Sequence, residues 1–188
     1  MQNDQFTVLF LGDVIGKPGR KAVGRYLEQN RADFVVINGE NLAGGIGITT
    51  RTAVEMLSLG VDAITTGNHV WKKKEVIPFL MEEKRVVRPL NYPRGTPGFG
   101  YTVVKKNDLS LCVANIEGRI FMNSLDCPFR AMEEFLEMER PDAPIIVDFH
   151  AEATSEKIAM GWYLDGRVTA LMGTHTHVQT ADDRVLPR

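Results

Sequence analysis

The sequence predicts an α/β protein in which apolar strands alternate with amphipathic helices. Short runs rich in Val and Ile recur along the chain, and most are separated by segments whose apolar residues return every three or four positions. Strand and helix alternate three times before two strands follow each other, so the sheet is not expected to be purely parallel. With 188 residues, 44% of them hydrophobic, we expect a single domain over residues 1–188.

The composition of the chain limits the kinds of molecule that the protein is expected to bind. The net charge is −2 with acidic and basic residues mixed along the chain, which disfavours extended nucleic acid but leaves a small nucleotide open. The N-terminus lacks a signal-type segment, and no stretch reaches the roughly 20 apolar residues that span a bilayer. Cys112 and Cys127 have neither metal-type nor disulfide-framework spacing and are expected to be reduced. We therefore expect a cytoplasmic protein with no membrane partner.

The first half of the chain is expected to form three strand and helix units. Residues 6–12 are a fully apolar run, typical of a central strand covered on both faces. The turn after it resembles a phosphate-binding P-loop, but the glycines are one residue too close and Pro18 stands where Ser or Thr would bind magnesium. The expected elements are strand 6–12, helix 19–30, strand 33–39, helix 50–59 with Thr49 or Thr50 as its cap and Gly60 at its end, and strand 61–66. Helix 50–59 is expected to bury Ala53, Val54, Met56 and Leu57.

A glycine-rich loop, residues 42–49, joins the second strand to the second helix. Its three glycines, Gly44, Gly45 and Gly47, allow a sharp turn or the close approach of a ligand to the backbone. A flexible connection and a substrate-binding loop are equally good interpretations of this segment.

The second half of the chain begins with an interrupted helix and a hairpin. Asn107 and Asp108 form a two-residue polar turn between two strand-like runs, which predicts an antiparallel pair. The last helix is expected to bury one face made of Ile158, Ala159, Trp162 and Tyr163. Residues 117–129 fit no expected element. The elements expected in this half are helix 72–84 broken at Pro78, strands 85–88, 101–106 and 109–115, helix 129–139, strand 144–149, helix 152–164 and strand 167–172.

All four histidines follow apolar runs, as do two carboxylates. These residues are His69, His150, His175 and His177, with Asp13 and Glu40. Residues i and i+2 of an extended segment point to the same side, so His175 and His177 can face one metal ion. Two surface loop histidines explain an isolated pair of this kind equally well. The repetition of the pattern at several strand ends favours a binding site.

Strand carboxyl ends meet at one edge of an α/β sheet, where ligand sites collect. If the five strands are neighbours, seven donors converge. They are Asp13, Glu40, Asn41, Asn68, His150, His175 and His177. Two metal ions sharing a carboxylate would use them all, and a donor set without thiolate favours iron, manganese or zinc. Taken singly, each has an alternative, because Asp13 or Glu40 can cap a helix and Asn68 can hold a turn.

The strand-end motifs resemble those of the calcineurin-like metallophosphoesterases. The motifs are Gly-Asp at 12–13, Gly-Asn-His at 67–69, His150 after a strand, and Gly-Thr-His-Thr-His at 173–177. Longer strings, such as Asp-Phe-His-Ala-Glu-Ala-Thr-Ser-Glu-Lys from residue 148, are similar to the bacterial YmdB-like 2',3'-cyclic-nucleotide 2'-phosphodiesterases. The resemblance covers nearly the whole chain. It implies a four-layer α/β/β/α sandwich with mixed sheets and a metal site at the strand C-terminal ends.

The resemblance also implies roles for individual residues. One metal would be held by Asp13, Glu40, Asn41 and His177, and the other by Glu40, Asn68, His150 and His175, with iron as the expected metal. His69 would donate a proton to the departing ribose oxygen, whereas its alternative is to orient a ligand. Val14 and Ile15 stand where most of the superfamily has a histidine, and Glu40 replaces an aspartate. Family members continue beyond Pro187, so we expect the chain to lack the family's C-terminal segment.

The expected activity is hydrolysis of small phosphodiesters, above all of 2',3'-cyclic nucleotides to 3'-nucleotides. A phosphomonoesterase, including one that acts on phosphoprotein, is the alternative within enzymes. A metal-dependent nucleotide sensor with little catalysis is the alternative from another class. Assembly into a homo-oligomer stays open.

Overall fold

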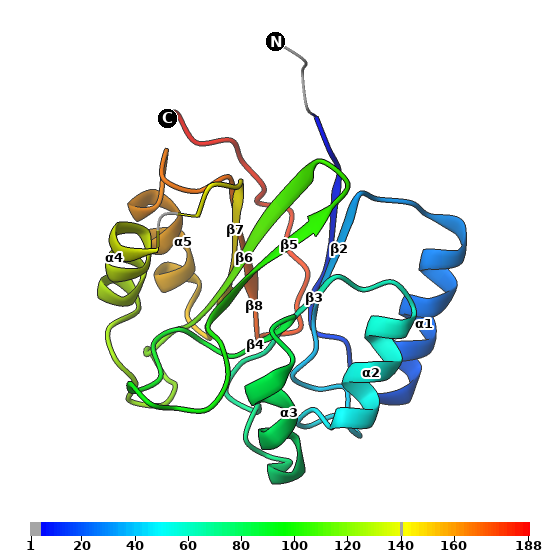
Figure 1. The fold of residues 1–188 in the computed structure, drawn as a ribbon. Coiled ribbons are helices and arrows are strands. Elements are labelled where there is room, and N and C mark those ends of the chain that lie inside the picture. The colour runs from blue at the N-terminus through cyan, green and yellow to red at the C-terminus, as the bar shows by residue number, and fades with distance from the viewer. Residues whose placement is uncertain (1–4, 140) are drawn as a thin grey trace.

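The protein is a sandwich of two sheets with helices on both outer faces. The computed structural model describes residues 5–139 and 141–188 (Figure 1). Within these residues, two four-stranded sheets face each other; α1 and α2 cover the outer face of one, and α4 and α5 cover the outer face of the other. The four-layer α/β/β/α arrangement expected from the resemblance is confirmed.

The first sheet is parallel throughout its described strands, in the order β1-β2-β3-β4. Every residue of β2 is buried, as expected for a parallel strand covered on both faces. Thr49 caps α2 through a capping box with Thr52, which confirms the predicted helix start. The elements are β1 (Val8–Leu11), α1 (Gly16–Gln29), β2 (Phe34–Asn38), α2 (Thr50–Ser58), β3 (Ala63–Thr65), η1 (Lys74–Val76), α3 (Ile77–Glu82) and β4 (Val86–Val87).

The second sheet is mixed, in the order β5-β6-β7-β8. The predicted hairpin is confirmed, since β5 and β6 pair antiparallel, whereas β6, β7 and β8 run parallel. Of residues 117–129, which fitted no predicted element, residue 117 ends β6, residues 118–127 form turns and irregular backbone, and residues 128–129 begin α4. The elements are β5 (Tyr101–Lys106), β6 (Leu109–Glu117), α4 (Pro128–Met138), β7 (Ile145–His150), α5 (Thr154–Tyr163) and β8 (Ala170–Thr174).

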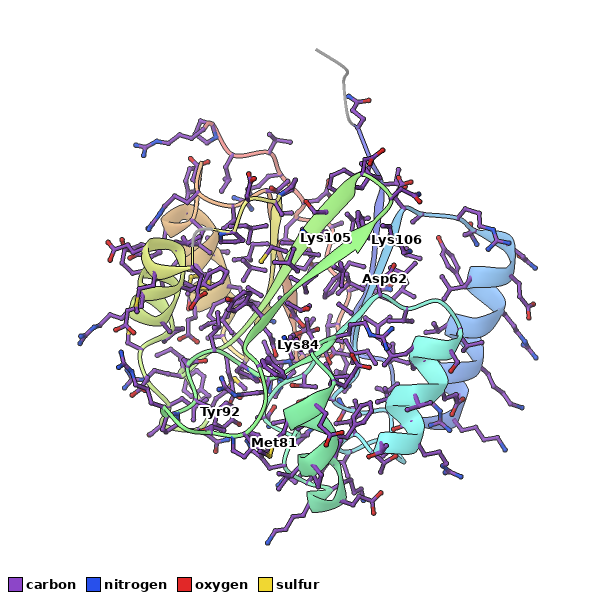
Figure 2. All side chains as sticks on the ribbon, in the orientation of Figure 1. Asp62, Met81, Lys84, Tyr92, Lys105 and Lys106 are labelled. Atoms are coloured by element: carbon purple, nitrogen blue, oxygen red, sulfur yellow. The ribbon has the colours of Figure 1, made fainter. Side chains whose placement is uncertain are left out.

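An apolar layer joins the two sheets, and several ion pairs and hydrogen bonds add to it. Phe34 and Val36 of β2 belong to the same buried cluster as Val113 of β6. At the end of β5, the Lys106 Nζ lies 2.7 Å from Oδ2 of Asp62, which directly precedes β3, and both residues are labelled in Figure 2. This packing fixes how the strand ends of one sheet lie relative to those of the other.

The position predicted for the first strand is wrong. Among the described strands, β1 pairs with β2 alone and lies at the edge of its sheet, and its four residues are half-buried. An apolar run in the sequence indicates that both faces of a strand are covered. It does not indicate how many other strands are hydrogen-bonded to that strand. For this reason residues 6–12 resembled a central strand.

The buried face predicted for α5 is wrong, and the face predicted for α2 is wrong at one residue. The four residues predicted to be buried in α5 are all exposed, namely Ile158, Ala159, Trp162 and Tyr163. Glu156 and Met160 are buried instead. Glu156 is buried because its carboxylate accepts backbone N–H groups of the loop after β6, at Arg119 and Ile120. In α2, Val54, which a buried face would include, is 45% exposed. None of the helices in the described residues has the length and apolar character needed to cross a membrane.

Candidate metal centre at the strand ends

The seven predicted donors lie together at the carboxyl ends of five strands. The prediction assumed that these five strands are neighbours in one sheet, and this is wrong. β1, β2 and β3 belong to the first sheet, and β7 and β8 belong to the second. The donors meet because the two sheets face each other with these ends on the same side. The site therefore lies where the two sheets meet and not along a single edge.

The first group of donors surrounds the Nε2 atom of His150. This atom lies 2.9 Å from Asn68 Oδ1, 3.1 Å from His175 Nδ1 and 3.3 Å from Glu40 Oε1. One ligand atom from each of Glu40, His150 and His175 lies within 4.8 Å of the other two. Glu40 and His150 are fully buried. Two imidazoles, a carboxylate and an amide oxygen thus converge on one point.

The second group lies on the other side of Glu40. Asn41 Nδ2 is 3.2 Å from Glu40 Oε1 and 3.2 Å from His177 Nε2, which in turn lies 3.7 Å from Asp13 Oδ1. This Asp13 oxygen is buried and has no hydrogen-bond partner among the described residues. A buried carboxylate oxygen without a donor is costly unless a cation is bound there. Asp13, Glu40 and His177 would hold a second ion here, whereas Asn41 presents its Nδ2 to this point and would have to turn its amide to offer Oδ1. Glu40 lies between the two groups.

The pair His175 and His177 approaches the site in a way that the spacing did not predict. Neither residue lies in extended backbone, because their φ angles are 101° and 56°. The two rings do not face one point: His175 joins the first group and His177 the second. Asp13 also has a positive φ, 41°. Positive φ is costly for residues other than glycine and is found at sites where function requires it.

Glu40 is one of the carboxylates at the centre, and its neighbours keep it ionised. Burial alone would raise the pKa of the Glu40 carboxyl, but the hydrogen bond and charge of His150 and the backbone N–H of His69 lower it to about 2. Glu40 is therefore an anion at neutral pH. Burial lowers the pKa of His150, yet Glu40, Asp148 and Asp13 outweigh this effect and raise it. Burial and the neighbouring His150 lower the pKa of His175.

His69 touches donors of the second group. Its backbone N–H donates to Glu40 Oε2 at 2.9 Å, and its Nδ1 lies 3.0 Å from Asn41 Oδ1 and 3.1 Å from Glu40 Oε1. Both neighbours of Nδ1 are acceptors, so this nitrogen carries the proton of the neutral ring. Nε2 has no such contact among the described residues, and the side chain is 26% exposed. One ring nitrogen is thus anchored while the other stays available.

Two residues at the centre were missed by sequence reasoning. Glu152 Oε2 lies 3.0 Å from His175 Nε2, and Gly67 packs against the ring of His150. Both stand next to predicted donors in the quoted motifs, which is the signal that would have identified them. In the glycine-rich loop, Gly44, Gly45 and Gly47 all have positive φ, so a tight turn is sufficient reason for these glycines.

A methyl group at position 67 is expected to disrupt the centre. A Cβ added to Gly67 would lie 2.2 Å from Cδ2 and 2.3 Å from Nε2 of His150, so Gly67→Ala must displace that ring. We expect a loss of about 1–3 kcal/mol of stability from overpacking, together with loss of metal binding. Thermal melting and metal titration measure both.

Gly161→Ala is the matched control, because a Cβ there meets nothing within 4 Å and the residue lies inside α5. It is expected to stabilise the protein by about 0.5–1 kcal/mol. A Gly67→Ala protein as stable and as metal-competent as this control would contradict the packing seen around His150.

Two facing sheets with helices outside, and carboxylates, amides and imidazoles at their strand ends, define a protein of the metallophosphoesterase class. Within that class, this chain belongs to the family described as YmdB-like protein, whose pattern matches residues 9–188. The chain is 50% identical over 186 residues to a protein of Bacillus subtilis (strain 168) named 2',3'-cyclic-nucleotide 2'-phosphodiesterase, covering 96% of this chain and 70% of that one.

Two solved structures are similar over almost the whole chain. A hypothetical protein from Thermus thermophilus has a TM-score of 0.88 at 48% identity, with 96% of this chain and 71% of the other covered. A novel phosphatase from Mycoplasma pneumoniae has a TM-score of 0.89 at 36% identity, with 97% and 68% covered. This chain therefore shares its fold with both of these proteins.

Proposed function

We propose that this protein is a dinuclear-metal phosphodiesterase of small phosphodiesters, with 2',3'-cyclic nucleotides as substrates and 3'-nucleotides as products. The observation that carries the proposal is the division of seven donors into two groups that share Glu40. The phosphodiesterase named among its relatives supports the choice of substrate.

The donor groups suit two ions of the iron, manganese or zinc type. One ion would be held by Asp13, Glu40, Asn41 and His177, and the other by Glu40, Asn68, His150 and His175. Oxygen and nitrogen donors without thiolate suit these metals, and iron is our choice among them. The partnerless buried oxygen of Asp13 is the feature that best fits a bound cation.

When bound, such a pair of ions supplies a nucleophile at neutral pH and neutralises charge on the phosphoryl group. The chain's own contribution is to hold the ligands and to manage one proton. His69 keeps its Nδ1–H on Asn41 and Glu40, which fixes the ring. In the imidazolium form of the ring, Nε2 carries a second proton, and this is the proton donated to the oxygen that departs from phosphorus. In a 2',3'-cyclic phosphate that oxygen is the 2' one, so the phosphate stays on the 3' position.

A substrate panel on metal-loaded protein tests the proposal. We expect rapid hydrolysis of 2',3'-cyclic AMP to 3'-AMP, slower hydrolysis of bis-p-nitrophenyl phosphate, and little hydrolysis of phosphomonoesters; chelated protein is the control. Absence of turnover with both diesters at full metal occupancy would remove the proposal. Faster turnover of monoesters would favour a phosphomonoesterase, and tight nucleotide binding without hydrolysis would favour a sensor.

The free thiols Cys112 and Cys127 support a reducing, cytoplasmic location.

A further inference from the structure

We propose that Phe121 is the surface on which the base of a nucleotide substrate stacks while the phosphate of that substrate lies at the metal centre. Phe121 belongs to the turn that follows β6. The inference rests on the proposed function for the position of the phosphate. It deepens that function by assigning the residue that recognises the nucleoside.

The ring of Phe121 is open to solvent. Phe121 is 89% exposed, and the preceding Ile120 is 47% exposed. An aromatic ring carries a large apolar surface, and its face can be covered by another flat ring. A single exposed apolar residue is nevertheless ordinary, so the exposure matters only together with the backbone of the turn and its position.

The backbone at Phe121 has a conformation that favours glycine. The N–H of Met122 donates to the carbonyl of Arg119 at 3.3 Å, so Phe121 is the third residue of a four-residue turn. Its φ is 62°. A turn with positive φ at this position usually holds Gly or Asn there, because a bulky side chain makes the conformation costly. A large ring kept in such a conformation is typical of a site where function requires it.

The turn is held in place on both sides of Phe121. The carboxylate of Glu156 accepts the backbone N–H groups of Arg119 and Ile120, at 3.0 Å and 3.2 Å. Met122, on the other side, packs against the buried cluster of the second sheet. The exposed ring is therefore carried by a fixed backbone. A surface that is already in place loses little conformational freedom when a ligand binds to it.

The same turn lies beside the first donor group of the metal centre. At the start of the turn, the Gly118 N–H donates to the backbone carbonyl of His150 at 2.9 Å. At its end, Met122 Sδ lies 3.3 Å from the backbone nitrogen of Glu152, and the carboxylate of Glu152 lies 3.0 Å from His175 Nε2. The exposed ring thus stands between two links to the histidines of this group.

The chemistry of the substrate fits this position. In a 2',3'-cyclic nucleotide the base is attached to C1' of the ribose, next to the carbon that carries the 2' oxygen. A phosphate held at the metal centre therefore brings the base to the rim of the centre, where the turn presents Phe121. Stacking on an aromatic side chain tolerates any base, since every base has a π-face. The ring would thus select nucleoside cyclic phosphates over cyclic phosphates that carry no base.

Phe121→Ala and Phe121→Trp form the matched pair, because Trp keeps an aromatic face and Ala removes it. With 2',3'-cyclic AMP and metal-loaded protein, we expect Phe121→Ala to raise KM by about 5–150-fold, the range that corresponds to loss of one base stack. We expect kcat to stay the same, because stacking binds substrate and transition state equally. Phe121→Trp is expected to keep both constants within a few-fold.

Trp162→Ala is the surface control, since it removes another exposed ring, from the end of α5 remote from the turn. It is expected to leave KM and kcat unchanged. Cyclic ethylene phosphate, which has no base, is the substrate control, and all variants are expected to hydrolyse it equally. An equal loss with this substrate in Phe121→Ala would overturn the proposal, because it would show that the turn supports the metal centre itself.

Titration of metal-loaded protein with 3'-AMP measures the stack without turnover, so it separates this proposal from the proposed function. We expect Phe121→Ala to bind 3'-AMP about 5–150-fold more weakly than Phe121→Trp. Absence of phosphodiesterase turnover would remove the proposed function and leave this result intact. Equal affinity of the two variants for 3'-AMP would overturn the stacking role, and a change of oligomeric state as the sole effect of Phe121→Ala would assign the ring to a contact between chains instead.

Discussion

Glu40→Gln protein is expected to lose both metal ions and, with them, phosphodiesterase turnover. Gln keeps the size of the side chain but removes the single negative charge that lies between the two donor groups. Loss of a partner outside the ligand shell of a metal typically costs about 10–100-fold in affinity, and we expect more than this from a ligand shared by both ions. Metal content per chain and the rise in melting temperature on addition of Mn²⁺ measure the effect.

Glu28→Gln provides the control, since Glu28 is an exposed residue of α1 and the substitution makes the same chemical change on the surface. It is expected to behave like the unsubstituted protein within about 0.5 kcal/mol. A Glu40→Gln protein that retains both ions and full turnover would show that Glu40 does not bridge them.

His69→Ala protein is expected to keep both ions and lose about 10²–10⁴-fold in turnover of 2',3'-cyclic AMP, the range typical of a lost general acid. The expectation follows from the geometry of the ring, whose Nδ1 is anchored on Asn41 and Glu40 while Nε2 is available. Steady-state rates and metal analysis of the same preparation provide the measurement.

Two substrates with different leaving groups provide a sharper test of the role of His69. A ribose oxygen needs a proton to depart, whereas p-nitrophenolate leaves readily without one. If His69 supplies that proton, His69→Ala loses far less with bis-p-nitrophenyl phosphate than with the cyclic nucleotide. Equal losses with both substrates, or loss of the metals, would instead assign His69 to holding Asn41 and Glu40 in place.

Most elements were predictable because their signals are local. The capping box at Thr49, the positive φ of Gly60 and the hairpin turn at Asn107 each depend on a few adjacent residues. Strand ends were predictable for the same reason, since a polar donor after an apolar run marks the place where a buried strand leaves the sheet.

Other features depend on contacts distant in the sequence. The edge position of β1 follows from which strands pair. The exposure of Ile158 and Trp162 follows from how α5 packs, because Met160 on another face of the helix joins the buried cluster of Val147 and Phe149 of β7. The buried Glu156 of that helix is satisfied by backbone groups 36 and 37 residues away, at Ile120 and Arg119. No periodicity within α5 could have indicated these partners.

By itself, the sequence determined which side chains stand at the strand ends and that their oxygen and nitrogen donors suit metal ions. Only the tertiary structure decided that two facing sheets supply them, that His175 and His177 separate into different groups, and that Glu40 lies between those groups. The physical reason is that apolar patterning is a property of neighbouring residues, whereas the meeting of donors depends on how the apolar faces of two sheets pack together.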